Sequence, residues 1–325
     1  MTTMAKARIL VAHRLPAEVE ARLSRDFAAE LNTADRVISA SELIPKARDF
    51  DALLISSMFK CRADVINALP ASIRMIATFS VGTDHIDIPA AKARNIAVSN
   101  TPDVLTDATA DISLLLMLGA ARGASWGDRM VRENKWPPPS LVAPLGLDFS
   151  ERRLGILGMG RIGQAVAKRA RAFNMELHYH NRKRLDAGLE HGATFHSRFE
   201  DMLPHCDFLS INCASTAETR GIVNGGTLSL LPPDAIVVNA ARGDIVDDEA
   251  LISALRSGKL AAAGLDVFKG EPNIDPRYRE LENVIMLPHL GSATKNTRIA
   301  MGMRAVDNLE AFFKGERPRD LLTGA

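Results

Sequence analysis

The stretch Gly158–Gly163 reads GMGRIG, a pattern whose chemistry is the binding of a dinucleotide pyrophosphate. The apolar run LGIL precedes it and the helix-prone run QAVAKRARAF follows it, which predicts a strand, a tight turn and a helix in that order. The first glycine allows the turn, the second lets backbone amides approach phosphate, and the third lets the helix pack closely on the strand. A glycine turn without a ligand is the alternative, and the flanking elements argue against it. The predicted cofactor-binding residues of this turn are Gly158, Met159, Gly160, Arg161 and Ile162.

The run HNRKR, residues 180–184, ends the next predicted strand and indicates which dinucleotide to expect. In an NAD-binding unit that strand ends with Asp or Glu, which accepts hydrogen bonds from the adenosine ribose. No acid stands here, and the basic side chains that follow complement a 2′-phosphate. Asn181, Arg182 and Lys183 therefore predict NADP(H), with NAD(H) as the weaker alternative. A solvated basic turn is the competing interpretation.

Composition places the chain among ordinary globular proteins. With 325 residues it exceeds what one hydrophobic core usually supports, so two domains are expected. The formal net charge of +1 gives no general attraction to nucleic acid or to an anionic membrane. Three cysteines without paired spacing suit a reducing compartment, and cytoplasm is the simplest assignment. The start MTTMAKARIL lacks a long apolar region, and the apolar run at 112–118 is too short to span a bilayer.

Short apolar runs alternate with amphipathic stretches in two series, from ARILVA to IAVSN and from LGILGMGRIG to NVIMLP. This alternation predicts an α/β protein with two doubly wound parallel-sheet domains. Between the series, residues 106–133 predict one long helix that is apolar on nearly every side of its first half, so burial between domains or subunits is expected. Residues 135–153 are rich in proline and glycine and predict an arm or linker. Residues 294–315 predict a final amphipathic helix.

Three further stretches are hard to explain by packing alone: SVGTDHID (80–87), NAARGDIVDDEAL (239–251) and the segment from AGLDVFKGEP to LPHLGSAT (263–294). With GMGRIG and TPDVLTD (101–107), they strongly resemble the D-isomer-specific 2-hydroxyacid dehydrogenase family. The resemblance covers nearly the whole chain and is greatest to the glyoxylate/hydroxypyruvate reductase branch. It implies that a dinucleotide-binding Rossmann domain, residues 102–293, is inserted into a flavodoxin-like substrate-binding domain, residues 1–101 and 294–325.

The resemblance also implies a catalytic set, since Arg242, Glu271 and His289 stand at the family's motif positions. Hydride addition to a ketone leaves negative charge on its oxygen, which calls for a cation and a proton donor. Arg242 suits the first role, and His289, favoured in its charged form by Glu271, suits the second. Taken singly, the three residues could be a surface ion-pair member, a turn residue and a packed loop residue. Together they all follow apolar strands, where ligands bind in open α/β sheets.

Substrate and cofactor contacts follow from the same resemblance. The backbone amides of Val81 and Gly82 are expected to bind the substrate carboxylate, together with the side chains of Arg242 and His289. Further cofactor contacts are implied at Thr106, Cys213, Ala240, Asp266 and Gly291, with Asp266 near the nicotinamide. The formate dehydrogenase branch has Gln in place of Glu271, so the acid favours keto acid chemistry.

These features predict an NADPH-preferring enzyme that reduces small 2-keto acids, such as glyoxylate and hydroxypyruvate, to the D-isomer of the 2-hydroxy acid where the product is chiral. The alternatives are a 2-ketogluconate reductase, a phosphite dehydrogenase, or a nucleotide-sensing binding protein like the transcriptional corepressors that resemble this family. Turnover with glyoxylate would separate enzyme from binding protein.

His178 and His180 share one strand face, but no third ligand has recognisable spacing, so no metal site is predicted. A small 2-keto or 2-hydroxy acid is the expected partner, and neither nucleic acid nor membrane is. Family members pair through the region of residues 106–133 and the following arm, including Trp136, so a homodimer is expected.

Overall fold

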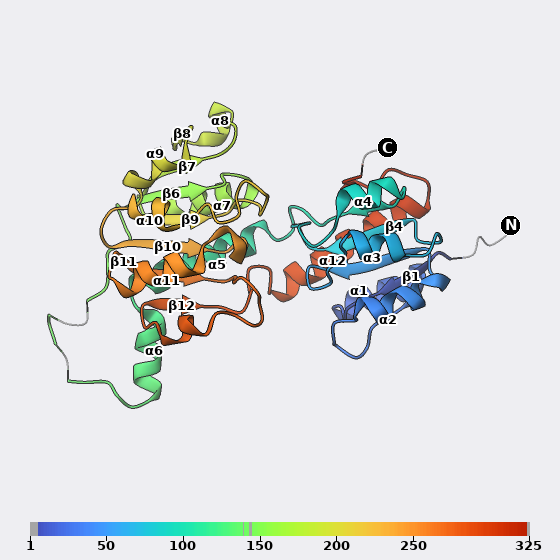
Figure 1. The fold of residues 1–325 in the computed structure, drawn as a ribbon, viewed down its shortest axis with the longest axis horizontal. Coiled ribbons are helices and arrows are strands. Elements are labelled where there is room, and N and C mark those ends of the chain that lie inside the picture. The colour runs from blue at the N-terminus through green and yellow to red at the C-terminus, as the bar shows by residue number, and fades with distance from the viewer. Residues whose placement is uncertain (1–5, 139, 143–144, 324–325) are drawn as a thin grey trace. The chain divides into compact units, whose positions relative to one another are not determined.

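The computed structural model describes residues 6–138, 140–142 and 145–323, and the chain divides into two compact units (Figure 1). One unit consists of Met1–Leu105 and Thr294–Ala325, and the other is Thr106–Ala293. The first boundary was expected after residue 101, and the division lies after Leu105. The second unit is therefore inserted into the first.

The first unit is built on a five-stranded parallel sheet in the order β2-β1-β3-β4-β5. Its strands are β1 (Arg8–Val11), β2 (Ala28–Glu30), β3 (Ala52–Ser56), β4 (Met75–Phe79) and β5 (Ala97–Ser99). Its helices are α1 (Ala17–Asp26), α2 (Ala40–Lys46), α3 (Ala63–Ala68), α4 (Ile88–Ala93) and α12 (Lys295–Phe313), with a 3₁₀ turn at Ala47–Asp49. This strand order is that of flavodoxin-like sheets, so the predicted architecture of this unit is confirmed. The final helix α12 returns to pack on β4 and α1.

The second unit is built on a seven-stranded parallel sheet in the order β12-β11-β10-β9-β6-β7-β8. Its strands are β6 (Arg153–Leu157), β7 (Glu176–His180), β8 (Thr194–His196), β9 (Phe208–Ile211), β10 (Ala235–Asn239), β11 (Leu260–Leu265) and β12 (Val284–Met286). Its helices are α5 (Thr106–Ala121), α6 (Ala124–Arg132), α7 (Arg161–Arg171), α8 (Ala187–Glu190), α9 (Phe199–Met202), α10 (Gly225–Ser229) and α11 (Asp248–Arg256). Short 3₁₀ turns occupy Leu203–His205, Gly243–Ile245 and Pro276–Glu280. The strand order reverses between β6 and β9, as in a Rossmann sheet, which confirms the predicted doubly wound class.

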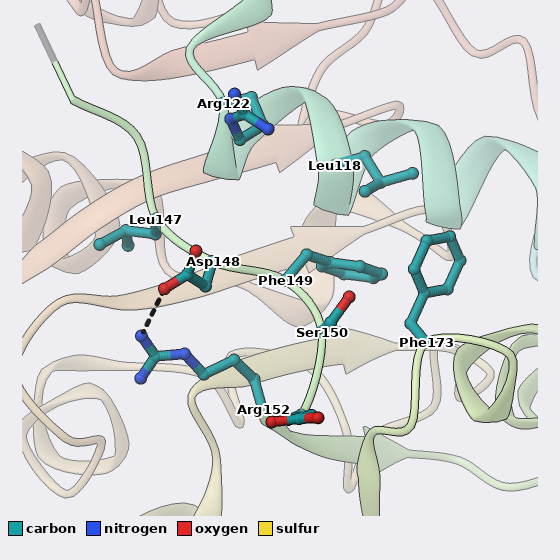
Figure 2. A pocket seen from close by; sticks show the side chains of 9 residues that line it. Leu118, Arg122, Leu147, Asp148, Phe149, Ser150, Arg152 and Phe173 are labelled. Carbon is teal, nitrogen blue, oxygen red and sulfur yellow. Dashed lines mark ion pairs between the residues drawn. The ribbon is translucent and has the colours of Figure 1, made fainter.

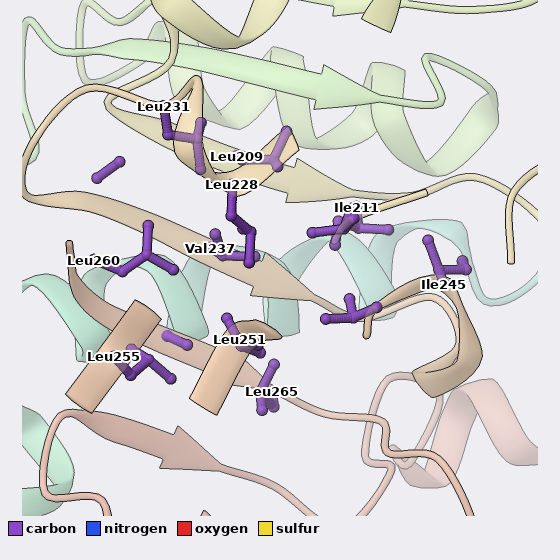
Figure 3. Close-up of a cluster of buried hydrophobic side chains, with 14 of the residues drawn as sticks. Leu209, Ile211, Leu228, Leu231, Val237, Ile245, Leu251, Leu255, Leu260 and Leu265 are labelled. Carbon is purple, nitrogen blue, oxygen red and sulfur yellow. The ribbon is translucent and has the colours of Figure 1, made fainter. Parts of the chain in front are cut away.

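Helices cover both faces of the second sheet, and strand β10 shows how the sequence achieves this. All five of its residues are buried. Ala235 and Val237 belong to one apolar core, while Ile236 and Val238 belong to the other. Successive side chains of a strand point to opposite faces, so a continuous apolar run fills two cores at once. Figure 3 shows the first of these cores, where Val237 lies among leucine and isoleucine side chains.

The prediction of a single helix at residues 106–133 is wrong, because this segment folds as two helices. Helix α5 ends at Ala121 and α6 begins at Ala124. Gly123 lies between them with φ +60°, in the left-handed region that glycine adopts without steric cost. The predicted burial of the apolar first half is accounted for within one unit, because α5 packs against α7 and strands β10 and β11. The arm that follows is irregular where it is described, and residues 139, 143 and 144 lie outside the described chain.

Candidate functional site

The loops that follow the strands of the second sheet carry most of the predicted site residues. All seven strands are parallel, so these loops meet at one edge, and ligands bind there where the strand order reverses. The loops after β6, β7 and β9 carry the glycine motif, the basic run and Cys213. The loops after β10, β11 and β12 carry Ala240 and Arg242, then Asp266 and Glu271, then His289 and Gly291.

The glycine motif has the geometry expected of a pyrophosphate-binding turn. Gly158 has φ +96°, and a Cβ there would lie 2.5 Å from the backbone nitrogen of Cys213. A Cβ on Gly163 would lie 2.3 Å from the carbonyl oxygen of Gly158, so α7 can begin only in close contact with the turn. No heavy atom lies within 4 Å of a Cβ built on Gly160. The residues therefore fit a dinucleotide, because the turn is closed on its protein side and open at its second glycine.

Asn181 joins the basic run to the glycine turn. Its Oδ1 accepts a hydrogen bond from the backbone N–H of Met159 at 2.7 Å. This contact fixes the amide group so that Nδ2 is the atom left to donate to a ligand.

The basic side chains of the run differ in their partners. Arg184 binds Glu190 at 2.8 Å, and the Tyr179 hydroxyl donates to the same carboxylate, so Arg184 is held in an internal ion pair. Arg182 and Lys183 are exposed. A hydrogen bond from Thr216 lowers the pKa of Glu218, and the positive charge of Arg182 makes a smaller contribution in the same direction. Arg182 and Lys183 are thus the cations of the run that a phosphate could recruit.

Glu271 and His289 form a direct contact, with 2.7 Å between Glu271 Oε1 and His289 Nδ1. The second carboxylate oxygen accepts from the backbone N–H of Phe268 at 3.3 Å. Burial acts to raise the pKa of Glu271, but the hydrogen bond and charge of His289, with the charge of Arg242, hold that pKa below its usual value. The Glu271 carboxylate is therefore in direct contact with His289 and stays ionised, with the charge of Arg242 acting in the same direction.

Arg242 owes its position to two neighbours that sequence analysis did not identify. The buried Asn239 accepts from the N–H of Ala241 at 3.0 Å and donates to the carbonyl of Arg242 at 2.8 Å, which closes the turn after β10. A Cβ on Gly243 would lie 2.0 Å from the carbonyl carbon of Phe268, so only glycine lets the Arg242 turn approach the Glu271 segment. A polar residue ending an otherwise apolar strand was the available signal for Asn239.

Asp266 holds the loop that carries His289. It is fully buried, and its two carboxylate oxygens accept from the N–H groups of Leu290 at 2.6 Å and Gly291 at 2.7 Å. Its carbonyl accepts from the N–H of His289 at 2.9 Å, and His289 has φ +57°. Burial raises the pKa of Asp266, while the two amide donors oppose that shift. The structure thus gives Asp266 a loop-positioning role, and its predicted contact with the nicotinamide stays a prediction.

Three more predicted residues lie outside these loops, one at the start of α5 and two in the other unit. Thr106 begins α5, and one turn further Thr109 donates to the carbonyl of Gly291 at 3.1 Å, which ties that end of the helix to the His289 loop. Val81 and Gly82 follow β4 at the carboxyl edge of the first sheet. The relation of these two amides to the catalytic cluster stays a prediction.

The histidines of β7 bind other histidines. His178 Nδ1 lies 3.0 Å from His196 Nε2, and the ring of His178 stacks on that of His205 at 5.2 Å. No group of metal-binding side chains with suitable geometry occurs among the described residues. Within the same residues, no helix is both long and apolar enough to cross a bilayer.

A surface hollow of about 680 Å³ lies away from the loops that carry the predicted site residues (Figure 2). It lies near the amino end of β6, and its wall includes Leu118, Phe149 and Phe173. Arg152 and Asp148 form an ion pair of 3.7 Å at its rim. None of the predicted site residues lines it.

Comparison with known proteins identifies the class of this fold and site. Residues 114–291 match the family model described as D-isomer specific 2-hydroxyacid dehydrogenase, NAD binding domain. The chain is 43% identical over 314 residues to the glycerate dehydrogenase of Hyphomicrobium methylovorum, covering 96% of this chain and 98% of the relative. It is 39% identical over 322 residues to the glyoxylate reductase of Pyrococcus furiosus, covering 98% and 95%.

A solved structure agrees with these relatives. The NADPH-dependent glyoxylate/hydroxypyruvate reductase of Sinorhizobium meliloti, in complex with NADP and malonate, superposes with a TM-score of 0.87 at 34% identity, covering 98% of this chain and 97% of that one. The second unit thus contains an NAD-binding domain in an oxidoreductase fold. The chain belongs to the D-isomer-specific 2-hydroxyacid dehydrogenase family.

Proposed function

We propose that the protein reduces small 2-keto acids, with glyoxylate and hydroxypyruvate as substrates and NADPH as the preferred cofactor. The product is the 2-hydroxy acid, in its D-isomer where it is chiral. The contact between His289 and Glu271, with Arg242 close enough to act on the same carboxylate, is the observation that carries the proposal. The names of the relatives, glyoxylate reductase and glycerate dehydrogenase, point to substrates of the same class.

In this proposal the three side chains divide the work on the ketone. Arg242 binds the carboxylate and the carbonyl oxygen of the substrate, because its planar guanidinium donates in a fixed fork and stays charged. His289 gives a proton to the carbonyl oxygen as negative charge develops on it. Glu271 holds Nδ1 of the ring and stabilises its charged form. A bound nicotinamide would supply the hydride, and the amides of Val81 and Gly82 bind the substrate carboxylate.

We infer that the cofactor binds along the glycine turn, Gly158–Ile162, with its adenosine ribose at the end of β7. Asn181 Nδ2, Arg182 and Lys183 would hold a 2′-phosphate by charge-assisted hydrogen bonds. The carboxylate that favours NAD over NADP is missing at the end of β7, which supports NADP(H) with NAD(H) as the weaker cofactor. The remaining contacts in this proposal are Thr106, Cys213, Ala240, Asp266 and Gly291.

Steady-state kinetics with a panel of acids tests this function. We expect glyoxylate and hydroxypyruvate to give the highest kcat/KM of the panel, and NADPH to give a higher value than NADH. Greater kcat/KM with 2-ketogluconate, or phosphite-dependent reduction of NAD⁺, would replace the proposal by one of the two alternative enzymes. Nucleotide binding without turnover of any panel member would favour the corepressor-like binding protein.

We infer further that the enzyme is a homodimer of the cytoplasm. Helix α5 packs largely within its own unit, whereas α6 and the arm expose several large apolar side chains. These are Val131, Trp136, Leu141, Val142 and Leu145. Trp136 is 73% exposed and Leu141 96%, and such a group favours an interface between chains. Cytoplasm is inferred from the free thiols of the three cysteines.

Sedimentation velocity at micromolar concentration is expected to give about twice the chain mass of 35.2 kDa. Trp136→Ser should shift the protein toward monomer, because it removes the largest exposed ring of the arm. A monomeric wild-type protein contradicts the dimer.

A further inference from the structure

Three polar side chains lie buried beneath the loop that follows β4 in the first unit. Thr78 and His85 have no exposed surface, and Ser80 is 6% exposed. Thr78 Oγ1 lies 2.9 Å from His85 Nε2 and 3.2 Å from Ser80 Oγ. Ser80 Oγ in turn donates to the carbonyl of Gly82 at 2.6 Å. The four groups form one continuous hydrogen-bonded chain.

The direction of this chain follows from the number of protons available. Ser80 has one hydroxyl proton and gives it to a carbonyl, which can only accept, so Ser80 Oγ accepts from Thr78. Thr78 has then used its own proton, and its oxygen accepts from Nε2–H of His85. The chain therefore runs from His85 through Thr78 and Ser80 to the loop, and every member is oriented by its neighbour.

Two further hydrogen bonds hold the same loop from inside the unit. Asn100 Nδ2 donates to the carbonyl of Val81 at 2.8 Å, and the N–H of Thr101 donates to the carbonyl of Ser80 at 2.9 Å. Asn308 on α12 binds the carbonyl of Asn100 at 3.2 Å and supports it. Three successive carbonyls, those of Ser80, Val81 and Gly82, are thus fixed.

Fixing these carbonyls also fixes three N–H groups. In a planar trans peptide the N–H of the next residue points opposite to the C=O, so the N–H groups of Val81, Gly82 and Thr83 are turned away from the side chains that hold the carbonyls. Within the described chain, none of these three N–H groups donates to a backbone carbonyl. The backbone bends at residues 80 and 81, and successive N–H groups in such a turn conformation make an anion-binding concavity.

We infer that Ser80, Thr78, His85 and Asn100 are positioning residues that hold the amides of Val81, Gly82 and Thr83 ready for the carboxylate of a 2-keto acid. The inference rests on the proposed function, and it adds the side chains that orient the substrate-binding amides. Ser80 contributes most, because it alone holds the Gly82–Thr83 peptide.

Ser80→Ala tests this role, with Ser99→Ala as the matched control. Ser99 is also buried in the first unit, but its hydroxyl has no hydrogen-bond partner among the described residues. We expect Ser80→Ala to raise the KM for glyoxylate and the dissociation constant of oxamate by roughly 3- to 10-fold, the factor for one lost hydrogen bond. The kcat and the KM for NADPH should stay near wild-type values, because the carboxylate contact is made equally in the ground and transition states. Ser99→Ala should change none of these values.

A double-mutant cycle separates positioning from general support of the fold. Thr78→Val removes the group that orients Ser80, so it should raise the same two constants by a smaller factor. Adding it to Ser80→Ala should have little further effect on oxamate affinity, because both act through one chain. Independent, additive losses of oxamate affinity would contradict the view that both side chains act through one hydrogen-bonded chain.

These measurements also distinguish a failure of the inference from a failure of the proposed function. A folded Ser80→Ala variant with wild-type glyoxylate KM and oxamate affinity overturns the inference alone, as does an equal rise in the KM for NADPH. A wild-type protein that reduces none of the keto acids overturns the proposed function.

Discussion

His289→Asn is expected to lower kcat for glyoxylate reduction by about 10²-fold or more, because the variant loses the side chain that gives a proton to the ketone oxygen. Asparagine is the suitable replacement, since His289 has φ +57° and asparagine tolerates the left-handed region. The backbone bond from residue 289 to Asp266 can therefore persist. The KM for NADPH should change little. Stopped-flow or steady-state assays at saturating cofactor measure the effect.

His191→Asn is the matched control for this substitution. His191 is exposed, has φ +49° and belongs to the same unit, but it lies in the turn after α8. It should retain wild-type turnover. Near-normal kcat in His289→Asn, with a folded protein, removes His289 from the mechanism.

Glu271 is the partner of the same histidine, and the pH dependence of keto acid reduction in Glu271→Gln tests its role. The variant keeps a group of the same shape beside Nδ1 but loses the negative charge that stabilises the charged imidazole. Because His289 and Arg242 hold the pKa of Glu271 below its usual value, this charge is present in the wild-type site, and its loss should move the pH optimum for keto acid reduction downward. An unchanged profile would leave the pairing without a catalytic role.

Arg182→Ala is expected to raise the KM for NADPH roughly 10- to 100-fold while changing the KM for NADH little, because it removes one charge-assisted contact to the 2′-phosphate. The kcat at saturation should hardly change, since this contact is the same in the ground and transition states. Arg152→Ala removes the same charge at the opposite edge of the sheet and should leave both constants unaltered. Equal losses with both cofactors would identify the basic run as a structural turn, and a wild-type preference for NADH would contradict the NADP(H) assignment.

Asn181→Asp extends this prediction, because a carboxylate oxygen can still accept from the N–H of Met159 and keep the glycine turn closed. The added charge repels a 2′-phosphate and accepts ribose hydroxyls, so the preference should move toward NADH.

The sequence predicted the fold class well because that class depends on repeated local patterns. Apolar runs such as AIVVN, β10, are buried on both faces, and each glycine of the 158–163 turn has the environment its position requires. The family was also predicted correctly from its motifs. The break at Gly123 was missed because helix-compatible residues continue on both sides of it, although a glycine at that point is a usual helix end.

The supporting contacts of the candidate site could not be predicted in the same way. Asp266 and Thr109 both act on the loop that follows β12, and their partners are known only once strand order brings those segments together. The chain from His85 to Gly82 is equally hidden, because its members lie on one short segment but point inward. No sequence period reports either kind of contact.

The hydrogen bond between Thr109 and Gly291 has a consequence for how the chain folds. The first unit is interrupted by about 190 residues, and a free loop of that length would have to be closed before α12 could pack on β4. Thr109 and Gly291 lie near the two ends of the inserted unit, and the Thr109 hydroxyl lies 3.1 Å from the Gly291 carbonyl oxygen. Folding of that unit therefore brings its ends together. The entropy of closing the long loop is then spent within the inserted unit, and the first unit assembles across a short connection. We therefore expect the first unit to fold faster once the second unit has folded.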